Sequence, residues 1–340
     1  LVYLAVGRPR ARRWQQTHTQ ITAQVSAALA ETLHTAHLAP SGSVSGDDCY
    51  RTEGLVELAL STSTSLFSRH NECQILTSGA DTYAALEEGF AGAEVHIHLV
   101  FYIFQPDGPG QRLRDCLVDR ARDGVTVRVL VDAVGSRGTD DTFWAPLVSA
   151  GGHVAVFGRP SWWSHVVHRD RVDYRNHRKI VVIDGAVGFT GGINIGREYL
   201  GLNPEIGYWR DSHVRLKGPA VLGLQQAFVE DWCLATEEIL QDRDLFPLPV
   251  EPAGPGDEVL VVPSAPGLKW SPLRALYGQA IANAHDRIWI TNPYFVPGRV
   301  IRLALVTAAL RGVDVRLLLP SRSDHLLVSL ASHSIYEELL

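Results

Sequence analysis

Two side chains with reactive groups stand close together in the middle of the sequence. His177 and Lys179 are two residues apart and come directly before the apolar run 180–183. Such a run is typical of a buried strand, and residues i and i+2 of a strand point to the same face. An imidazole can act as a nucleophile or carry a proton, and an ammonium group can stabilise charge on phosphate oxygens. The pair therefore indicates chemistry on a phosphate group.

The residues after this run fit a ligand site as well as an ordinary turn. Asp184 and Gly185 have the sequence of a hairpin turn, which is compatible with a catalytic role for the aspartate. Gly191 and Gly192 would let the backbone approach a ligand, and Asn194 offers a side-chain amide donor. A helix beginning here would add its N-terminal amides to an anion site.

A basic stretch precedes the pair. Six Lys or Arg residues lie between positions 159 and 179, whereas the whole chain carries a net charge of -6. We expect Arg175 and Arg178 to bind substrate phosphate. The alternative for a charge run is a solvated, salt-bridged loop.

The elements that would position these residues alternate between strand and helix. Residues 95–103 alternate in polarity and are rich in strand formers, residues 113–121 have the apolar spacing of a helix, and residues 125–131 form the next expected strand. This order predicts an α/β fold with a parallel sheet covered by helices.

An internal repeat divides the chain. The segment Gly124–Leu130 recurs as Gly312–Leu318, and each copy follows a helix that follows a strand with an aromatic cluster. We expect two similar halves, separated by the linker 246–256, which contains four prolines and two glycines.

Composition sets broad limits. The 340 residues suffice for about two domains, and 46% of them are hydrophobic, as expected for a folded globular protein. Four widely spaced cysteines indicate neither a zinc site nor a disulfide framework. The net charge of -6 argues against a general nucleic-acid coat, so any anionic partner must meet local basic clusters.

The N-terminal segment has two interpretations. Residues 1–14 begin apolar and continue into four arginines and Trp14, which fits the end of a membrane helix followed by a basic juxtamembrane segment. A frayed terminus with a solvated basic run is the alternative. The chain starts at Leu1 and contains no methionine, so we expect a fragment without its true N-terminus. Residues 15–75 are expected to form a helical connector, with helices over 17–38 and 55–67.

The full pattern around the reactive pair resembles a known family. His177, Lys179, Asp184, Gly191, Gly192 and Asn194 satisfy HxKxxxxDxxxxxxGGxN, the HKD signature of the phospholipase D superfamily. Within it the chain is similar to the bacterial cardiolipin synthases, in the segments 99–107, 132–136, 171–179, 208–211, 217–220, 292–297 and 311–316. The resemblance implies a phospholipase D-like fold of two similar α-β-α halves, the first over 76–245 and an incomplete second over 257–340.

The resemblance also implies roles for the residues. His177, Lys179 and Asp184 would be catalytic, with His177 as nucleophile. Asn194, Gly191, Gly192, Arg175 and Arg178 would bind the substrate phosphate. The reaction would convert two phosphatidylglycerol molecules to cardiolipin and glycerol through a phosphohistidine, and it would need neither a metal nor ATP. The protein would lie at the bacterial cell membrane, with its catalytic part on the cytoplasmic side and anionic phospholipid as its partner.

Family members carry two HKD motifs, and this chain shows one. The repeat offset places a partner histidine near position 365, beyond Leu340. The fragment alone is therefore expected to be inactive. Three alternatives remain open: a phospholipase D that uses water as acceptor, a nucleic-acid phosphodiesterase, which the acidic composition disfavours, and a non-catalytic protein that binds anionic lipid.

Several other residues have simpler interpretations. We expect His96 and His98 to pack in the core, and His165 and His168 to lie in an exposed loop. Trp162, Trp163 and Trp209 could be buried or could face a membrane.

Overall fold

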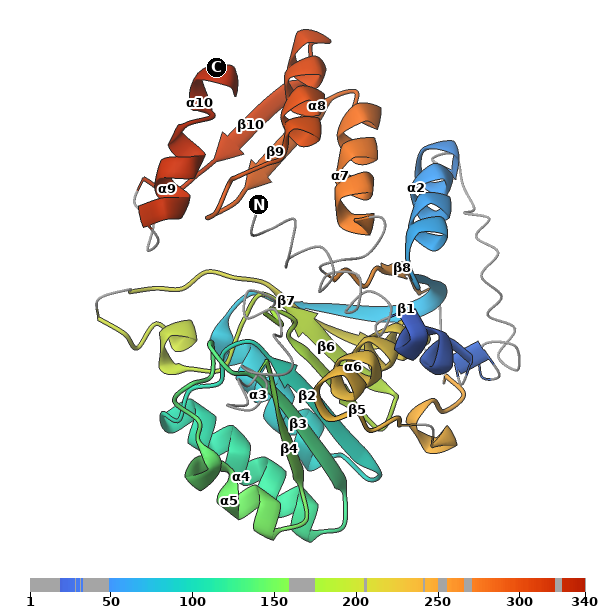
Figure 1. The fold of residues 1–340 in the computed structure, drawn as a ribbon, viewed down its shortest axis with the longest axis vertical. Coiled ribbons are helices and arrows are strands. Elements are labelled where there is room, and N and C mark those ends of the chain that lie inside the picture. The colour runs from blue at the N-terminus through green and yellow to red at the C-terminus, as the bar shows by residue number, and fades with distance from the viewer. Residues whose placement is uncertain are drawn as a thin grey trace, which may run out of the picture. The chain divides into compact units, whose positions relative to one another are not determined.

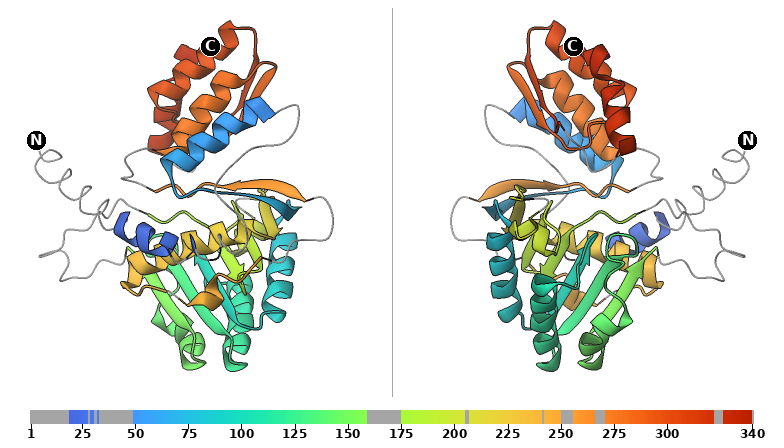
Figure 2. Two further views of the ribbon diagram at one scale, coloured as in Figure 1. Left: turned by 90° about the vertical axis from the view of Figure 1, so that its right-hand side faces the viewer. Right: turned by 90° about the vertical axis from the view of Figure 1, so that its left-hand side faces the viewer.

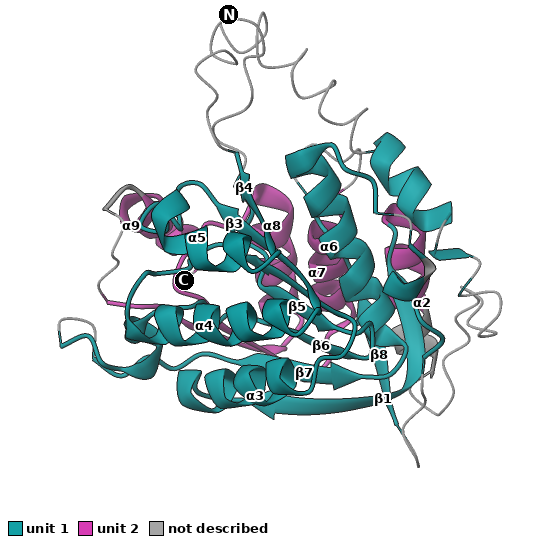
Figure 3. Cartoon of the chain, turned by 90° about the horizontal axis from the view of Figure 1, so that it is seen from below, with its two compact units in different colours: residues 1–40, 64–267 teal, residues 41–63, 268–340 magenta. Residues whose placement is uncertain are grey.

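The chain forms two compact units in the computed structural model, which describes residues 19–27, 29, 30, 32, 49–158, 175–204, 207–240, 242–249, 256–265, 271–321 and 326–339. The first unit comprises residues 1–40 and 64–267, and the second comprises residues 41–63 and 268–340 (Figure 3). The predicted membrane-helix remnant at 1–14, and His165, His168, Trp162 and Trp163, lie outside the described residues. Among the residues that are described, no helix has the length and apolar character required to cross a bilayer.

An eight-stranded sheet organises the first unit, in the order β4-β3-β2-β5-β6-β7-β1-β8 (Figure 1). The strands β2, β3 and β4 run parallel to one another, and every pair from β2–β5 across to β1–β8 is antiparallel. Their bounds are β1 Leu66–Leu76, β2 His96–Phe101, β3 Thr126–Asp132, β4 His153–Phe157, β5 Ile180–Ile183, β6 Val187–Gly191, β7 His213–Lys217 and β8 Asp257–Val261.

Helices cover both faces of this sheet (Figures 1 and 2). The helices α3 Gly79–Ala91, α4 Gly108–Arg122 and α5 Asp141–Ser149 form one core with one face. The helix α6 Ala220–Thr236 and the helical residues 19–27 form a second core on the other face. Because β2 and β5 are covered on both sides, all of their residues are buried, which explains the unbroken apolar run of β5 and the burial of His96 and His98 in β2. The predicted α/β fold is confirmed.

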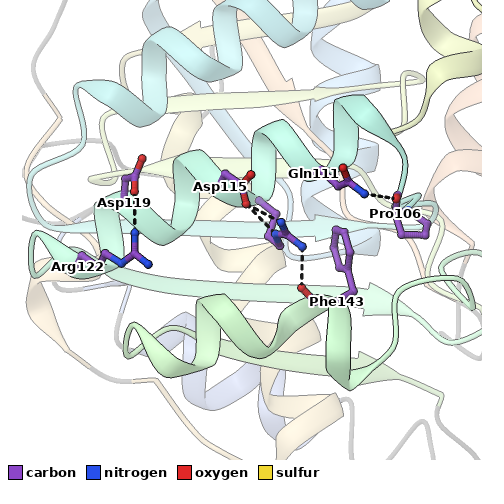
Figure 4. Close-up of polar contacts among 7 residues, drawn as sticks. Pro106, Gln111, Asp115, Asp119, Arg122 and Phe143 are labelled. Atoms are coloured by element: carbon purple, nitrogen blue, oxygen red, sulfur yellow. Dashed lines mark hydrogen bonds and ion pairs between the residues drawn. The ribbon is translucent and has the colours of Figure 1, made fainter.

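The helices of the first unit begin and end at recognisable signals. Asp107 caps α4 by accepting a hydrogen bond from the Gly110 amide at 3.2 Å, and Asp140 caps α5 by accepting from the Phe143 amide at 2.9 Å. Arg114 of α4 donates to the Phe143 carbonyl at 3.1 Å and also pairs with Asp115 (Figure 4). The hydrogen bond from Arg114 to Phe143 joins α4 to α5.

The second unit contains a two-stranded parallel sheet of β9 and β10. Its core joins Ile281, Phe295, Leu305, Ala308, Val313 and Ile335. The elements are α2 Cys49–Thr62, α7 Pro272–Asn283, β9 Arg287–Thr291, α8 Arg299–Leu310, β10 Asp314–Leu318, α9 Leu326–His333 and α10 Tyr336–Leu339.

The repeat found in the sequence corresponds to equivalent structure. Gly124 follows α4 with φ 91°, and Gly312 follows α8 with φ 89°. Each precedes a strand, β3 or β10, that pairs in parallel with the strand before its helix. A side chain would strain the left-handed conformation that both turns require, which accounts for glycine at the same repeat position.

The structure divides the chain differently from the sequence-based division. The region 15–75, expected to be a helical connector, contains β1, which joins the main sheet, and α2, which belongs to the second unit. The predicted helix over 55–67 ends at Thr62, because Leu66 and Phe67 pair with β8. The unit boundary lies at 267, after the proposed linker 246–256, since β8 pairs with β1 of the first unit.

Candidate active site

The strand β5 places His177 and Lys179 at one end of the sheet and Asp184 at the other. It lies between β2 and β6, and its four residues are buried. Lys179 and Asp184 flank these residues, so at about 3.3 Å per residue their Cα atoms lie roughly 16 Å apart. The structure therefore brings two of the three predicted catalytic residues together and separates the third.

His177 and Lys179 meet around the ring of Tyr102. The His177 imidazole stacks on Tyr102 with 3.7 Å between ring centroids and 18° between planes. Lys179 Nζ lies 5.5 Å from the same ring and donates to the His177 carbonyl oxygen at 2.7 Å. Tyr102 follows β2, which ends at Phe101. These contacts hold the imidazole and the ammonium group side by side.

The surroundings set the charge of the two groups. Burial lowers the pKa of Lys179 to about 8, against the opposing attraction of Asp211. Burial lowers the pKa of His177, with a further contribution from the Lys179 charge, and Asp132 opposes both. Near neutral pH the imidazole is therefore neutral and able to attack, while the ammonium group still carries its charge.

Asp132 anchors the segment that leads to His177. It is fully buried at the end of β3 and accepts hydrogen bonds from the backbone amides of Val134 at 2.8 Å and Asn176 at 3.1 Å. Arg175 forms an ion pair with Asp132, with 3.7 Å between Nη1 and Oδ1. The predicted phosphate ligand Arg175 thus lies near the site but has a carboxylate partner within the protein.

Arg178, the other predicted phosphate ligand, is directed away from the site. Its guanidinium donates to Asp231 Oδ1 of α6 at 2.6 Å and to the Ser264 carbonyl at 3.3 Å. Asp231 Oδ2 also accepts a hydrogen bond from the side-chain amide of Asn176 at 2.8 Å. Residues 177 and 179 use one face of the chain, whereas residue 178 uses the opposite face, so the guanidinium expected to bind phosphate is directed toward α6.

The predicted phosphate ligand Asn194 is engaged with the protein. Its side-chain oxygen accepts from the Ile103 amide at 3.1 Å, and its amide donates to the Tyr199 hydroxyl at 2.7 Å. Its role in this structure is to join the loop after β6 to the end of β2. The following helix is only the short 3-10 helix Arg197–Leu200, so the expected helical anion site is absent from these described residues.

Gly191 and Gly192 admit a neighbouring segment of the chain. A Cβ atom on Gly192 would lie 2.2 Å from Asp211 Oδ1, and one on Gly191 would lie 2.5 Å from the Cα atom of His213. The close approach expected of the two glycines is present, but the approaching group is the segment before β7. Absence of side chains there allows Asp211 to stand near Lys179.

Asp184 forms the hairpin turn between β5 and β6. It has φ 52°, Gly185 has φ 63°, and the Ala186 amide donates to the Ile183 carbonyl at 3.0 Å. Its carboxylate accepts from the backbone amides of Glu94 at 2.9 Å, Val95 at 2.8 Å and His96 at 2.8 Å. In this structure the carboxylate expected to be catalytic has a structural role, because its lone pairs accept hydrogen bonds at the start of β2.

Four residues of the site had no role assigned from the sequence: Tyr102, Asp132, Asp211 and His213. Tyr102, Asp132 and Asp211 stand in segments that resemble the family, which was the available signal. His213 gave no such signal, because a single histidine at the start of a short strand is uninformative. The expected packing of His96 and His98 is confirmed, since both are buried and His98 stacks on Phe228 with 4.5 Å between ring centroids. Trp209 is partly buried and contacts Tyr199, with 5.0 Å between ring centroids.

Comparison with known proteins identifies the family. The model of a family described as "Cardiolipin synthase, PLD-like domain" matches residues 67–232 and 277–340, which is more than half of the chain. The chain belongs to this family. The cardiolipin synthase family match includes His177, Lys179 and the strands around them.

Curated relatives support the same assignment. The major cardiolipin synthase ClsA of Bacillus subtilis is 39% identical over 293 residues, covering 86% of this chain and 60% of the relative. A cardiolipin synthase of Geobacillus kaustophilus is 42% identical over 290 residues, covering 84% of this chain and 56% of the relative. The chain thus spans less than two thirds of the length of these relatives.

A solved structure shares the fold. The phosphatidylserine synthase of Haemophilus influenzae Rd KW20 superposes with a TM-score of 0.55 at 14% identity, over 84% of this chain and 72% of that one. At this identity the likeness concerns the fold alone.

Proposed function

We propose that this chain is the catalytic part of a phosphatidyltransferase that converts two phosphatidylglycerol molecules to cardiolipin and glycerol. The observation that carries the proposal is the juxtaposition of His177 and Lys179 around Tyr102 in a member of the cardiolipin synthase family. A nucleophile must be unprotonated and a phosphate ligand must be cationic. The lowered pKa of His177, and that of Lys179 at about 8, permit both states near neutral pH.

The proposed reaction has two displacements at phosphorus. A neutral nitrogen of His177 attacks the phosphorus of the first phosphatidylglycerol, and the bond from phosphorus to the headgroup glycerol oxygen breaks. Glycerol leaves with a proton, which in this proposal comes from a second HKD histidine of the whole protein. A hydroxyl of the second phosphatidylglycerol then gives its proton back to that histidine and attacks, and the bond from phosphorus to His177 breaks. The covalent intermediate conserves the phosphodiester energy, so no ATP is needed.

Lys179 would stabilise the negative charge that develops on the non-bridging oxygens. Its ammonium group is partly buried, which strengthens its attraction to an oxyanion compared with an exposed lysine. Asp211 keeps this group charged to higher pH than burial alone would allow. The substrate class is an anionic phospholipid, and we place the enzyme at the bacterial cell membrane with this site on the cytoplasmic side.

The decisive experiment uses the full-length protein and phosphatidylglycerol vesicles. We expect mass spectrometry to detect cardiolipin and glycerol in equal amounts. Phosphatidic acid in place of cardiolipin would instead identify a hydrolase that uses water. No lipid product at all would leave only a lipid-binding role.

A matched pair of variants tests the nucleophile. His177→Ala should remove product by several orders of magnitude, because a lost nucleophile has no substitute. His153→Ala, at an exposed histidine of β4, should keep wild-type activity. Mass spectrometry after a rapid quench should detect a phosphatidyl adduct on residue 177 of the wild type. An adduct elsewhere would reassign the nucleophile.

A further inference from the structure

His213 is a buried histidine whose ring has no assigned use. It begins β7, it is 2% exposed, and neither ring nitrogen has a hydrogen-bond partner among the described residues. Leaving a buried polar group unsatisfied costs about 1–3 kcal/mol. Such groups are uncommon in native proteins, and each one calls for a physical explanation.

The register of the sheet places His213 beside Lys179. Ile180 pairs with Thr190 and Gly191 pairs with His213, so Lys179, one residue before Ile180, lies opposite Gly191. Directly opposite residues of antiparallel strands share a face. Lys179 and His213 therefore flank Gly191 on one face, and Gly191 contributes no side chain between them.

The ring of His213 lies against this glycine. A Cβ atom on Gly191 would be 2.7 Å from His213 Nδ1, a contact that is too close for any other residue. The remaining strand neighbour of His213 is Leu76 of β1, which cannot form hydrogen bonds through its side chain. Across β6, the register puts the Lys179 side chain on the same face as this imidazole, and the Lys179 charge acts on the ring.

The charges around His213 are consistent with a neutral ring. Burial lowers the pKa of His213 to about 4, and the charge of Lys179 acts in the same direction. Lys179 is also attracted by Asp211, from the loop before β7, and its charge lowers the pKa of His177. A neutral imidazole keeps one acceptor nitrogen, while an ammonium group has three donors, of which one is used on the His177 carbonyl.

We propose that His213 is a positioning residue of the phosphate site, which accepts a hydrogen bond from Lys179 and so directs the ammonium group at the substrate phosphate. The inference rests on the proposed function, since it assigns the phosphate to Lys179. It adds a third histidine to the site, one that stays neutral and does not contact the lipid.

Three variants of the full-length enzyme test this role. His213→Phe fills the volume without an acceptor, and His213→Gln restores a neutral acceptor. His96→Phe is the matched control, because His96 is also buried, is 1% exposed, and has no hydrogen-bond partner for its ring among the described residues. It pairs with Thr126 at the end of β2 where Asp184 lies. Activity is measured as kcat/KM on phosphatidylglycerol vesicles between pH 6 and 9, and folding by circular dichroism.

We expect His213→Phe to lose about 10²-fold in kcat/KM, the cost of a misplaced catalytic group. In this variant, the fall of kcat/KM at high pH should begin at a lower pH, because the Lys179 ammonium group without its acceptor loses its proton more easily. His213→Gln should recover most of the rate and the wild-type pH profile, and His96→Phe should keep both. A folded His213→Phe enzyme with the wild-type rate and profile would overturn the proposal. Equal losses in the Phe and Gln variants would also overturn it, since packing alone would then explain them.

A direct measurement separates this inference from the proposed function. The pKa of Lys179 can be followed by NMR of its labelled ε-carbon in the same proteins. It should fall by about one unit in His213→Phe and remain near the wild-type value in His213→Gln. If the wild type forms no cardiolipin, the proposed function fails, and this titration still decides the role of His213. An unchanged Lys179 pKa in His213→Phe would refute it.

Discussion

Asp184 offers the sharpest test of how the site is built, because the structure assigns it to folding. The substitution Asp184→Ala removes a carboxylate that accepts three backbone hydrogen bonds, from Glu94, Val95 and His96. It also places alanine at φ 52°, where a residue other than glycine, asparagine or aspartate is strained. Both effects act on the turn and on the start of β2.

The expected loss in the free energy of unfolding follows from these contacts. Hydrogen bonds to charged groups contribute about 1.5–3 kcal/mol each, and water can replace part of that at the two exposed amides. With about 1 kcal/mol of backbone strain, the free energy of unfolding should fall by about 4 kcal/mol, or roughly 10 °C in Tm. Asp184→Asn should cost about 1 kcal/mol. Its amide oxygen can replace Oδ1, which holds the Val95 and His96 bonds, and asparagine tolerates the positive φ.

Urea unfolding followed by circular dichroism measures these differences. Asp119→Ala serves as the control, because Asp119 forms an exposed ion pair with Arg122 that should contribute little. The folded fraction of Asp184→Asn should retain kcat/KM within a few-fold of wild type. If Asp184→Asn is as stable as the control and yet loses orders of magnitude in rate, the aspartate takes part in the chemistry and our assignment is wrong.

Three further outcomes follow from the site. The rate should fall as pH rises through about 8, because Lys179 then loses the proton that makes it a phosphate ligand; a pH profile of kcat/KM with an unchanged rate at pH 9.5 would contradict this. Arg178→Met should lower the free energy of unfolding by about 3 kcal/mol, because Asp231 is left as an unpaired buried charge, and the added change Asp231→Leu should recover part of it in urea titrations. Gly192→Ala should displace Asp211, whose Oδ1 would lie 2.2 Å from the new methyl group. The fall of kcat/KM at high pH should then begin at a lower pH. An unchanged pH profile would show that Asp211 does not act on Lys179.

Features that depend on local sequence were predictable. The apolar run at 180–183 gave a buried strand, the Asp184–Gly185 pair gave a hairpin turn, and the repeated glycines at 124 and 312 gave equivalent turns. In each case the physical cause lies within a few residues, either as burial on both faces of a strand or as a positive φ. The same reasoning placed His177 and Lys179 on one face.

Features that depend on distant partners were not predictable. The sequence around Arg178 predicts a phosphate ligand, but in the fold its guanidinium donates to Asp231, which lies 53 residues later in the chain. The sequence around Asn194 predicts a donor to substrate, but in the fold its side-chain amide accepts from the Ile103 backbone and donates to the Tyr199 hydroxyl. The predicted helix over 55–67 overran into β1, because the apolar spacing continues and the pairing with β8 that makes a strand is invisible locally.

The position of β8 has a practical consequence for dividing this protein. A cut at residue 256, in the proline-rich segment, would look natural from the sequence. It would remove Asp257–Val261 and leave the first part of β1 as an open edge, with unpaired amide and carbonyl groups along Leu66, Phe67 and Ser68. Long uncovered edges recruit other strands, so such a piece should self-associate. A piece extended to residue 267 would keep β8 paired with β1 and so protect this edge.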